Sequence, residues 1–106
     1  MESKRIADAA SFSEDKMRKN ALFDSERFFY DLYCFLPGQA QKVHAHEGSD
    51  KVYYVLRGTG RFTVGDEVRD LGIGHAVIAR AGEQHGVRNE TGAELVLLVT
   101  MAPRPS

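Results

Sequence analysis

Residues 38–58 read GQAQKVHAHEGSDKVYYVLRG, and the fold prediction starts from this pattern. The stretch contains two short strand-like runs, residues 42–46 and 51–57, with a glycine-containing turn between them. All 10 glycines lie after position 37, and they divide the rest of the chain into similar short runs. Turns about eight to twelve residues apart are typical of an antiparallel all-β barrel or sandwich.

The predicted strands are residues 27–36, 42–46, 51–57, 60–64, 76–79, 85–89 and 94–101. Residues 13–20 have a helical composition, but Lys16 stands three residues after Ser13, where a capping box needs an acid. We therefore expect an irregular or short-strand segment there. Residues 64–68 are expected to form a turn.

The chain has 106 residues, which is enough for one domain. We divide it into an N-terminal segment, residues 1–26, that covers the barrel or a dimer partner, and a barrel domain, residues 27–103. No internal repeat or low-complexity tract interrupts either part.

The composition argues against several classes of partner. The 14 Lys and Arg residues nearly balance the 15 Asp and Glu residues, so the basic surface that a nucleic acid requires is not expected. No apolar stretch approaches the roughly 20 residues of a membrane helix, and the first ten residues lack the apolar core of a signal peptide. Cys34 has no second cysteine to pair with, which is consistent with a reducing compartment. We therefore expect a soluble, cytoplasmic protein that binds neither nucleic acids nor membranes.

Two of the predicted strands are apolar on both faces. Residues 27–36 and 52–56 carry aromatic and aliphatic side chains at both strand parities, which a sheet with one solvated face does not show. A second layer must therefore cover the outer face, and we expect a homodimer to supply it. The alternative is that Phe12, Leu22 and Phe23 fold back and cover this face within the monomer.

Three of the four histidines have the spacing of metal ligands. His44 and His46 are two residues apart, so in a strand they point to the same face with their Cα atoms about 6–7 Å apart. His85 begins a later predicted strand, which a small barrel can place beside the first. Three imidazoles suit Zn, Fe, Mn, Ni or Cu. His75 is expected to be an ordinary surface histidine.

These histidines belong to two longer motifs. The first consists of Gly38, five residues, His44, one residue, His46, four residues, Lys51, six residues and Gly58. The second consists of Gly74, five residues, Arg80, one residue, Gly82, two residues, His85, three residues and Asn89. The spacing resembles the two motifs of the cupin family, with Lys51 in place of the usual Glu and Arg80 in place of the usual Pro. The short separation of the motifs is similar to that in small single-domain microbial cupins.

The resemblance implies a conical double-stranded β-helix, or jelly roll, with a metal pocket at its axis. It also implies that His44, His46 and His85 bind a divalent transition metal, namely Fe, Mn, Ni or Zn. Members of this family include dioxygenases, isomerases, decarboxylases, sugar epimerases and non-catalytic binders, so the fold alone does not define a reaction.

Lys51 is the important departure from the family pattern. An ammonium group cannot ligate a cation, and two unit charges 4 Å apart repel each other by about 4 kcal/mol at an effective dielectric constant near 20. Four resolutions are open: Lys51 loses its proton, it swings out into water, Asp50 or Glu47 becomes the fourth ligand, or the site binds no metal. We favour a three-histidine site with positions open to a ligand.

Lys51 and Tyr53 share the inward strand parity and are the candidate catalytic residues. Lys51 is suited to anchor a substrate carboxylate or to act as a general base, and Tyr53 to donate a hydrogen bond. The expected apolar lining consists of Phe35, Val55, Phe62, Val64 and Val87.

The predicted function is that of a small metal-binding cupin that binds or acts on a small organic molecule, with a dioxygenase-like or isomerase step. The alternative is a non-catalytic ligand-binding or accessory module. A third interpretation is a metal-free barrel in which Lys51 takes the place of the cation.

Overall fold

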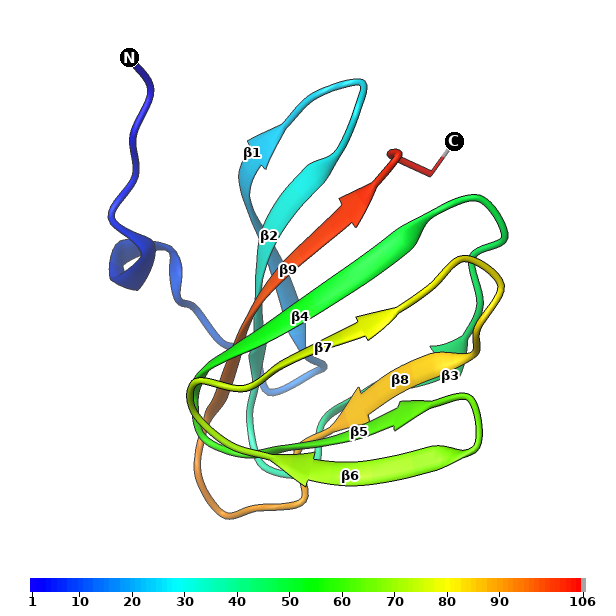
Figure 1. The fold of residues 1–106 in the computed structure, drawn as a ribbon. Helices are drawn as coiled ribbons and strands as arrows, with labels where there is room; N and C mark the ends of the chain where they lie inside the picture. Colours follow the sequence, from blue (N-terminus) through cyan, green and yellow to red (C-terminus); the bar gives the residue numbers. More distant parts are fainter. Residues whose placement is uncertain (106) are drawn as a thin grey trace.

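The structure, a computed structural model, describes residues 1–105, which form two antiparallel β-sheets (Figure 1). The five-stranded sheet has the order β1 (Arg18–Asp24), β2 (Phe29–Phe35), β9 (Leu95–Ala102), β4 (Asp50–Arg57) and β7 (Ala76–Ala79). The four-stranded sheet has the order β3 (Ala40–His44), β8 (His85–Arg88), β5 (Gly60–Val64) and β6 (Glu67–Leu71). The two sheets face each other as the halves of a barrel, so the predicted all-β jelly roll is confirmed.

Strand β4 shows how the sequence pattern defines the inside of the barrel. Lys51, Tyr53 and Val55 are buried, whereas the alternate residues Val52 and Tyr54 are exposed. This alternation follows from the pleat, which sends successive side chains to opposite faces. The inward residues pack in one core cluster between the sheets, which consists of Met17, Tyr33, Phe35, Tyr53, Val55, Phe62, Val87, Leu95, Leu97 and Val99.

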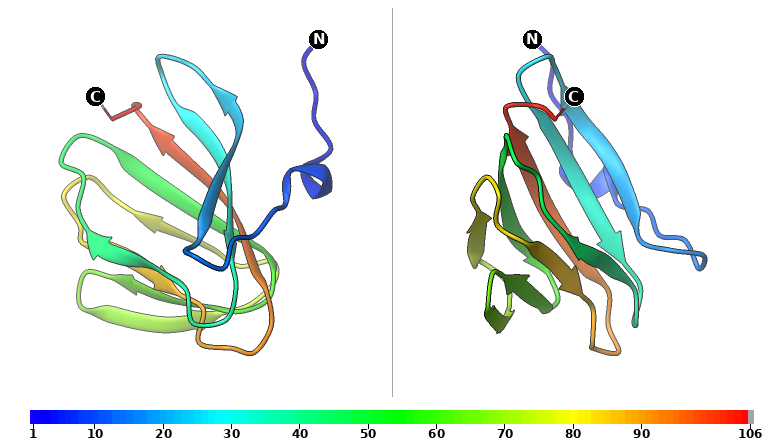
Figure 2. Two further views of the ribbon diagram at one scale, coloured as in Figure 1. Left: turned by 180° about the vertical axis from the view of Figure 1, so that it is seen from behind. Right: turned by 90° about the vertical axis from the view of Figure 1, so that its right-hand side faces the viewer.

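A second core cluster lies on the outer face of the five-stranded sheet. Its buried members are Leu22, Leu32, Cys34 and Val96. The N-terminal segment, with the short 3-10 helix η1 (Ile6–Ala9), runs along the outside of the sheet and packs on these residues (Figure 2). This part of the outer face is thus covered within the monomer, in agreement with the alternative to a dimer that the sequence left open.

The outer face of β4 and β7 has no such cover within the described chain. Val52, Tyr54 and Ile78 remain more than one-third exposed. Val52 pairs with Ile78 across the two strands, so the exposed apolar residues are neighbours. None of the helices in residues 1–105 has the length and apolar character needed to cross a membrane.

Two strands differ from the prediction. Strand β1 begins in the segment expected to be irregular or a short strand and extends beyond it, and it pairs with β2, so the five-stranded sheet begins before residue 27. Strand β6 forms where only a turn was expected, because Gly65 adopts a φ of +58° and reverses the chain into a hairpin with β5. Both are edge strands with largely exposed side chains, so neither has the apolar alternation by which strands are predicted.

Candidate metal centre

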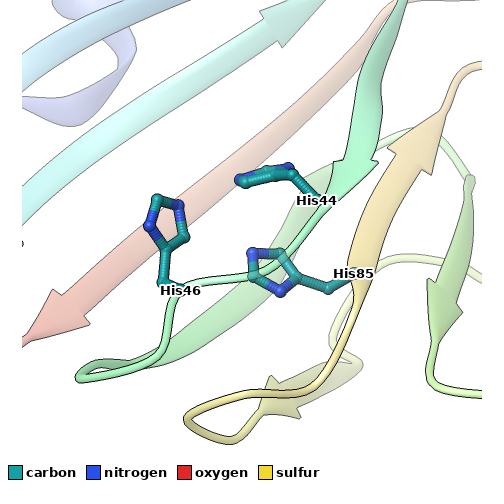
Figure 3. Close-up of side chains that lie close together, drawn as sticks. All are labelled: His44, His46 and His85. Carbon is teal, nitrogen blue, oxygen red and sulfur yellow. The ribbon is translucent and has the colours of Figure 1, made fainter.

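The structure brings the three predicted histidines together at one end of the barrel (Figure 3). His44 ends β3 and pairs in register with His85 at the start of β8, while His46 follows in the loop after β3. Their ring nitrogens lie within 4.8 Å of one another. The ring centroids of His44 and His85 are 4.5 Å apart, and those of His46 and His85 are 5.7 Å apart.

Gly86 allows the two ligand-bearing strands to approach. A Cβ atom at this position would lie 2.9 Å from both the carbonyl oxygen of Gln41 and the backbone nitrogen of Val43. These are backbone atoms of β3, so any larger residue would push β8 away from β3. The glycine therefore helps to place His85 beside His44.

Hydrogen bonds orient two of the imidazole rings. The Nδ1 atom of His44 lies 2.7 Å from the carbonyl oxygen of Lys42, and that of His85 lies 3.0 Å from the carbonyl oxygen of Glu83. A carbonyl oxygen only accepts hydrogen bonds, so Nδ1 carries the proton and donates it in each ring. The Nε2 atoms are then left with a lone pair, which is the arrangement that backbone carbonyls give to metal-binding histidines.

The surroundings of His85 are compatible with an ion in the cluster. It is 2% exposed, and its Nε2 atom is buried without a hydrogen-bond partner among the described residues. Burial lowers the pKa of His85, and the positive charges of Lys51, His44 and His46 lower it further, while the bond to Glu83 opposes the shift. Burial also lowers the pKa of His46, with His44 and Lys51 adding to the effect. Neutral imidazoles with free nitrogens are the form that binds a metal, so the residues fit a divalent cation.

Lys51 lies inside the barrel. It is 2% exposed, and its Nζ atom lies 5.1 Å from the centroid of the Tyr33 ring and 5.3 Å from that of Tyr53. The outward swing into water considered from the sequence is therefore wrong. Burial lowers the pKa of Lys51 to about 7, the charge of Lys19 contributes, and Asp31 opposes the shift. A neutral amine at this position reduces the repulsion of a nearby cation.

Neither candidate carboxylate joins the histidines. Asp50 is exposed, and its Oδ1 atom accepts a hydrogen bond of 2.9 Å from the backbone nitrogen of Ala81. Glu47 is exposed in the loop after His46. Within residues 1–105, the cluster able to hold an ion consists of the three histidines alone. The bulge that Asp50 would have needed to turn inward is absent at that point of β4, where pairing with β7 and β9 is regular around Lys51.

Tyr53 points inward, and its hydroxyl donates a hydrogen bond of 2.8 Å to Oε1 of Gln41. Gln41 is 8% exposed, and its Nε2 atom has no hydrogen-bond partner in the described chain. The sequence analysis missed Gln41 because its parity is opposite to that of His44. The register of β3 against β8 shifts between these two residues, and this β-bulge turns both side chains inward.

The other residues singled out in the sequence lie in the core or on the surface, outside the histidine cluster. Four of the five expected lining residues, Phe35, Val55, Phe62 and Val87, belong to the core between the sheets, and Val64 is half-buried. Asn89 is buried, and its amide donates hydrogen bonds to the carbonyl oxygens of Phe35 and Ala93. His75 is exposed, and its Nδ1 atom lies 3.1 Å from the carbonyl oxygen of Gly72.

Two antiparallel sheets that face each other, with three histidines converging from β3, β8 and the adjoining loop, define a protein of the jelly-roll class. The cupin domain family model matches residues 31–101, and the chain belongs to the cupin family. The predicted family resemblance is thereby confirmed.

Several known proteins are similar to the chain. The crystal structure of TT1209 from Thermus thermophilus is 54% identical, covers 99% of this chain and 100% of its own, and superposes with a TM-score of 0.97. An RmlC-like cupin protein from Desulfovibrio desulfuricans is 31% identical, with 98% of each chain covered and a TM-score of 0.85. An oxalate-binding protein from Thermotoga maritima is 30% identical over 87 residues, which are 80% of this chain and 69% of that protein.

Proposed function

We propose that this protein is a small cupin that holds a divalent transition metal through His44, His46 and His85 and binds a small organic molecule beside it. The buried, unpartnered Nε2 atom of His85 carries the proposal, because a buried nitrogen lone pair without a partner is costly unless a ligand satisfies it. Three imidazoles accept Fe, Mn, Ni or Zn without strong discrimination. When bound, such a metal supplies Lewis acidity to an oxygen of the ligand.

The organic ligand proposed is a small molecule with a carboxylate group. Lys51 offers the ammonium that would anchor this group, and with its pKa near 7 it is also suited to accept a proton as a general base. Tyr53 positions the Gln41 amide through its hydroxyl and contributes an aromatic wall. The relative described as an oxalate-binding protein supports a carboxylate ligand. We further propose that the ligand undergoes an oxygenase-type or isomerase step in which Lys51 and Tyr53 are the catalytic residues.

The second candidate is a non-catalytic binding module. It is favoured by the missing acidic ligand, since Lys51 stands at the position where the cupin motif usually has Glu. In this case the barrel binds the carboxylate without converting it, and the lysine supplies part or all of the positive charge that the metal would otherwise give.

Calorimetric titration of the protein with oxalate tests the proposal. Protein stripped of metal with a chelator and protein reloaded with Mn²⁺ are compared, each as wild type, His85→Ala and the surface control His75→Ala. We expect the metal to strengthen oxalate binding at least about tenfold in wild type and His75→Ala but not in His85→Ala. Equal binding with and without Mn²⁺ would contradict the metal-dependent form and favour the binding module. NMR spectra of the oxalate after incubation show whether it is converted.

We also propose that the exposed face made by Val52, Tyr54 and Ile78 is the contact of a homodimer. These residues form a continuous apolar patch on β4 and β7, and such patches are commonly buried between subunits. Light scattering of the wild type and of Tyr54→Lys tests this, with a dimer expected for the first and a monomer for the second. A monomeric wild type at high concentration would exclude the dimer. The cytoplasmic location stays a prediction that cell fractionation can test.

A further inference from the structure

A basic cavity lies at the open side of the barrel, between the edge strands of the two sheets. Strand β1 ends the five-stranded sheet and β3 ends the four-stranded sheet. Between them is a cavity of about 760 Å³, lined by residues of the segment 13–19 and by residues 40–42. None of the three histidines lines it, so the cavity is separate from the histidine cluster.

The charges around this cavity favour an anion. Lys16, Arg18, Lys19 and Lys42 line it, and Asp15 is the acidic residue among its lining. The five ion pairs found within residues 1–105 involve none of these four basic side chains. None of the four therefore forms an ion pair within the described chain, and the lining keeps an excess of positive charge although Asp15 is part of it and Asp31 lies close enough to Lys19 to feel its charge. A concave surface with an excess of one sign of charge raises the local concentration of oppositely charged ligands.

One lining residue, Gln41, also carries a buried amide donor that has no hydrogen-bond partner in the described chain. Gln41 lines the cavity and is 8% exposed, and its Oε1 atom is occupied by the Tyr53 hydroxyl. The remaining polar atom, Nε2, is a donor without a partner among the described residues. An amide donor pairs with an acceptor such as a carboxylate oxygen, and not with a cation.

Two contacts link the cavity to the interior of the barrel. The Nζ atom of Lys19 lies 5.3 Å from the centroid of the Tyr33 ring, and the Nζ atom of Lys51 lies 5.1 Å from the same centroid. On the opposite wall, the carbonyl oxygen of Lys42 accepts the hydrogen bond from His44. The cavity is therefore connected to Lys51 through the Tyr33 ring and to His44 through the Lys42 carbonyl group.

We propose that the β1–β3 cavity binds the carboxylate of a small organic anion and is the route by which this ligand reaches the barrel interior. Lys19 supplies the charge and the Gln41 amide supplies a directed hydrogen bond. Binding in the cavity does not depend on the proposed function. Only the second step, in which the same ligand reaches the three-histidine site, rests on it. The ligand class is a small organic carboxylate, and neutral analogues are expected to bind poorly.

NMR titration of ¹⁵N-labelled full-length protein with oxalate at constant ionic strength tests the inference. Two samples are titrated, one stripped of metal and one loaded with Zn²⁺. Zn²⁺ is used in place of Mn²⁺ because it is diamagnetic and leaves the spectra sharp. We expect amide shifts in residues 15–19 and 40–42 in both forms. Lys19→Gln is expected to weaken binding about five- to tenfold. Gln41→Glu keeps the acceptor for Tyr53 but replaces the donor with a carboxylate, and it should weaken binding further.

Lys4→Gln is the matched control, since it removes one lysine charge outside the cavity. The inference is overturned if the shifts fall elsewhere, or if Lys4→Gln and Lys19→Gln weaken binding equally, which would indicate only a general charge effect. Thermal melting confirms that Gln41→Glu is folded, and the surface variant Lys19→Gln decides the question if it is not. Shifts at the cavity in stripped protein that takes up no Zn²⁺ would refute the metal site while supporting the cavity.

Discussion

The Nζ atom of Lys51 lies 5.1 Å from the centroid of the Tyr33 ring. The ring of Tyr53 lies at 5.3 Å, so two aromatic rings flank the amine in the interior of the barrel. Aromatic faces attract a cation, but burial opposes the charge more strongly, and the pKa of Lys51 falls to about 7. Lys51, the residue that departs from the family pattern, is therefore close to equally divided between its charged and neutral forms near pH 7.

This balance predicts how stability depends on pH. Between pH 7 and the ordinary lysine pKa of 10.5, Lys51 is neutral in the folded protein and charged in the unfolded chain. The unfolded state binds more protons there, so the free energy of unfolding rises with pH, by about 1 kcal/mol per pH unit. Below pH 7 both states are protonated, and the folded state bears the full cost of the buried charge.

The Lys51→Met variant isolates this effect. Urea denaturation of metal-stripped protein from pH 6.5 to 9.5 should show the stability advantage of Lys51→Met over wild type shrinking as the pH rises above 7. Tyr33, Tyr53, Asp31 and Lys19 are retained in both proteins, so the comparison removes the contributions that do not depend on Lys51. What remains is the titration of Lys51 and its effect on neighbours such as Asp31. Parallel pH profiles for the two proteins would show that Lys51 keeps an ordinary pKa.

Lys51→Glu is expected to raise the affinity for a divalent metal. The substitution removes a positive charge from the interior and places a carboxylate where many cupins have one. At an effective dielectric constant near 20 the change in electrostatic energy amounts to several kcal/mol, so the affinity should rise at least about tenfold. Competition with a chelating dye measures it, with Lys4→Glu as the control for net charge. An unchanged affinity would mean that the repulsion of the lysine is not felt at the histidines.

The hydrogen bond from Tyr53 to Gln41 makes a separate prediction. Tyr53→Phe leaves both polar atoms of the Gln41 side chain without a protein partner, since Nε2 already has none in the described chain. A buried polar group that loses its partner costs about 1–3 kcal/mol. Urea denaturation should show this loss for Tyr53→Phe and its partial recovery in the double variant Tyr53→Phe/Gln41→Leu. A double variant less stable than Tyr53→Phe would show that the amide is satisfied in another way.

The sequence predicted those features that depend on local periodicity and motif spacing. His44, His46 and His85 were found because strand parity and the two motifs place them together, and the inward face of β4 follows from simple alternation. Strands β1 and β6 escaped prediction because edge strands with exposed polar residues carry no apolar alternation.

The inward orientation of Gln41 and the charged neighbours of Asp31 could not be predicted from sequence periodicity. A β-bulge between Gln41 and His44 reverses the parity that the sequence implies. Asp31 lies on the inner face, where burial raises its pKa and Lys19 and Lys51 lower it, and these neighbours come from other strands. Pairings between distant strands depend on the tertiary fold, so the cavity between β1 and β3 was also not predicted.

Elemental analysis of the untagged protein, beside the His44→Ala and His85→Ala variants, tests the metal site most directly. We expect a near-stoichiometric amount of a divalent transition metal in the wild type and in the surface control His75→Ala, and its loss in both site variants. Wild-type protein that carries no metal and cannot be loaded with Zn²⁺, Mn²⁺, Ni²⁺ or Fe²⁺ would contradict it.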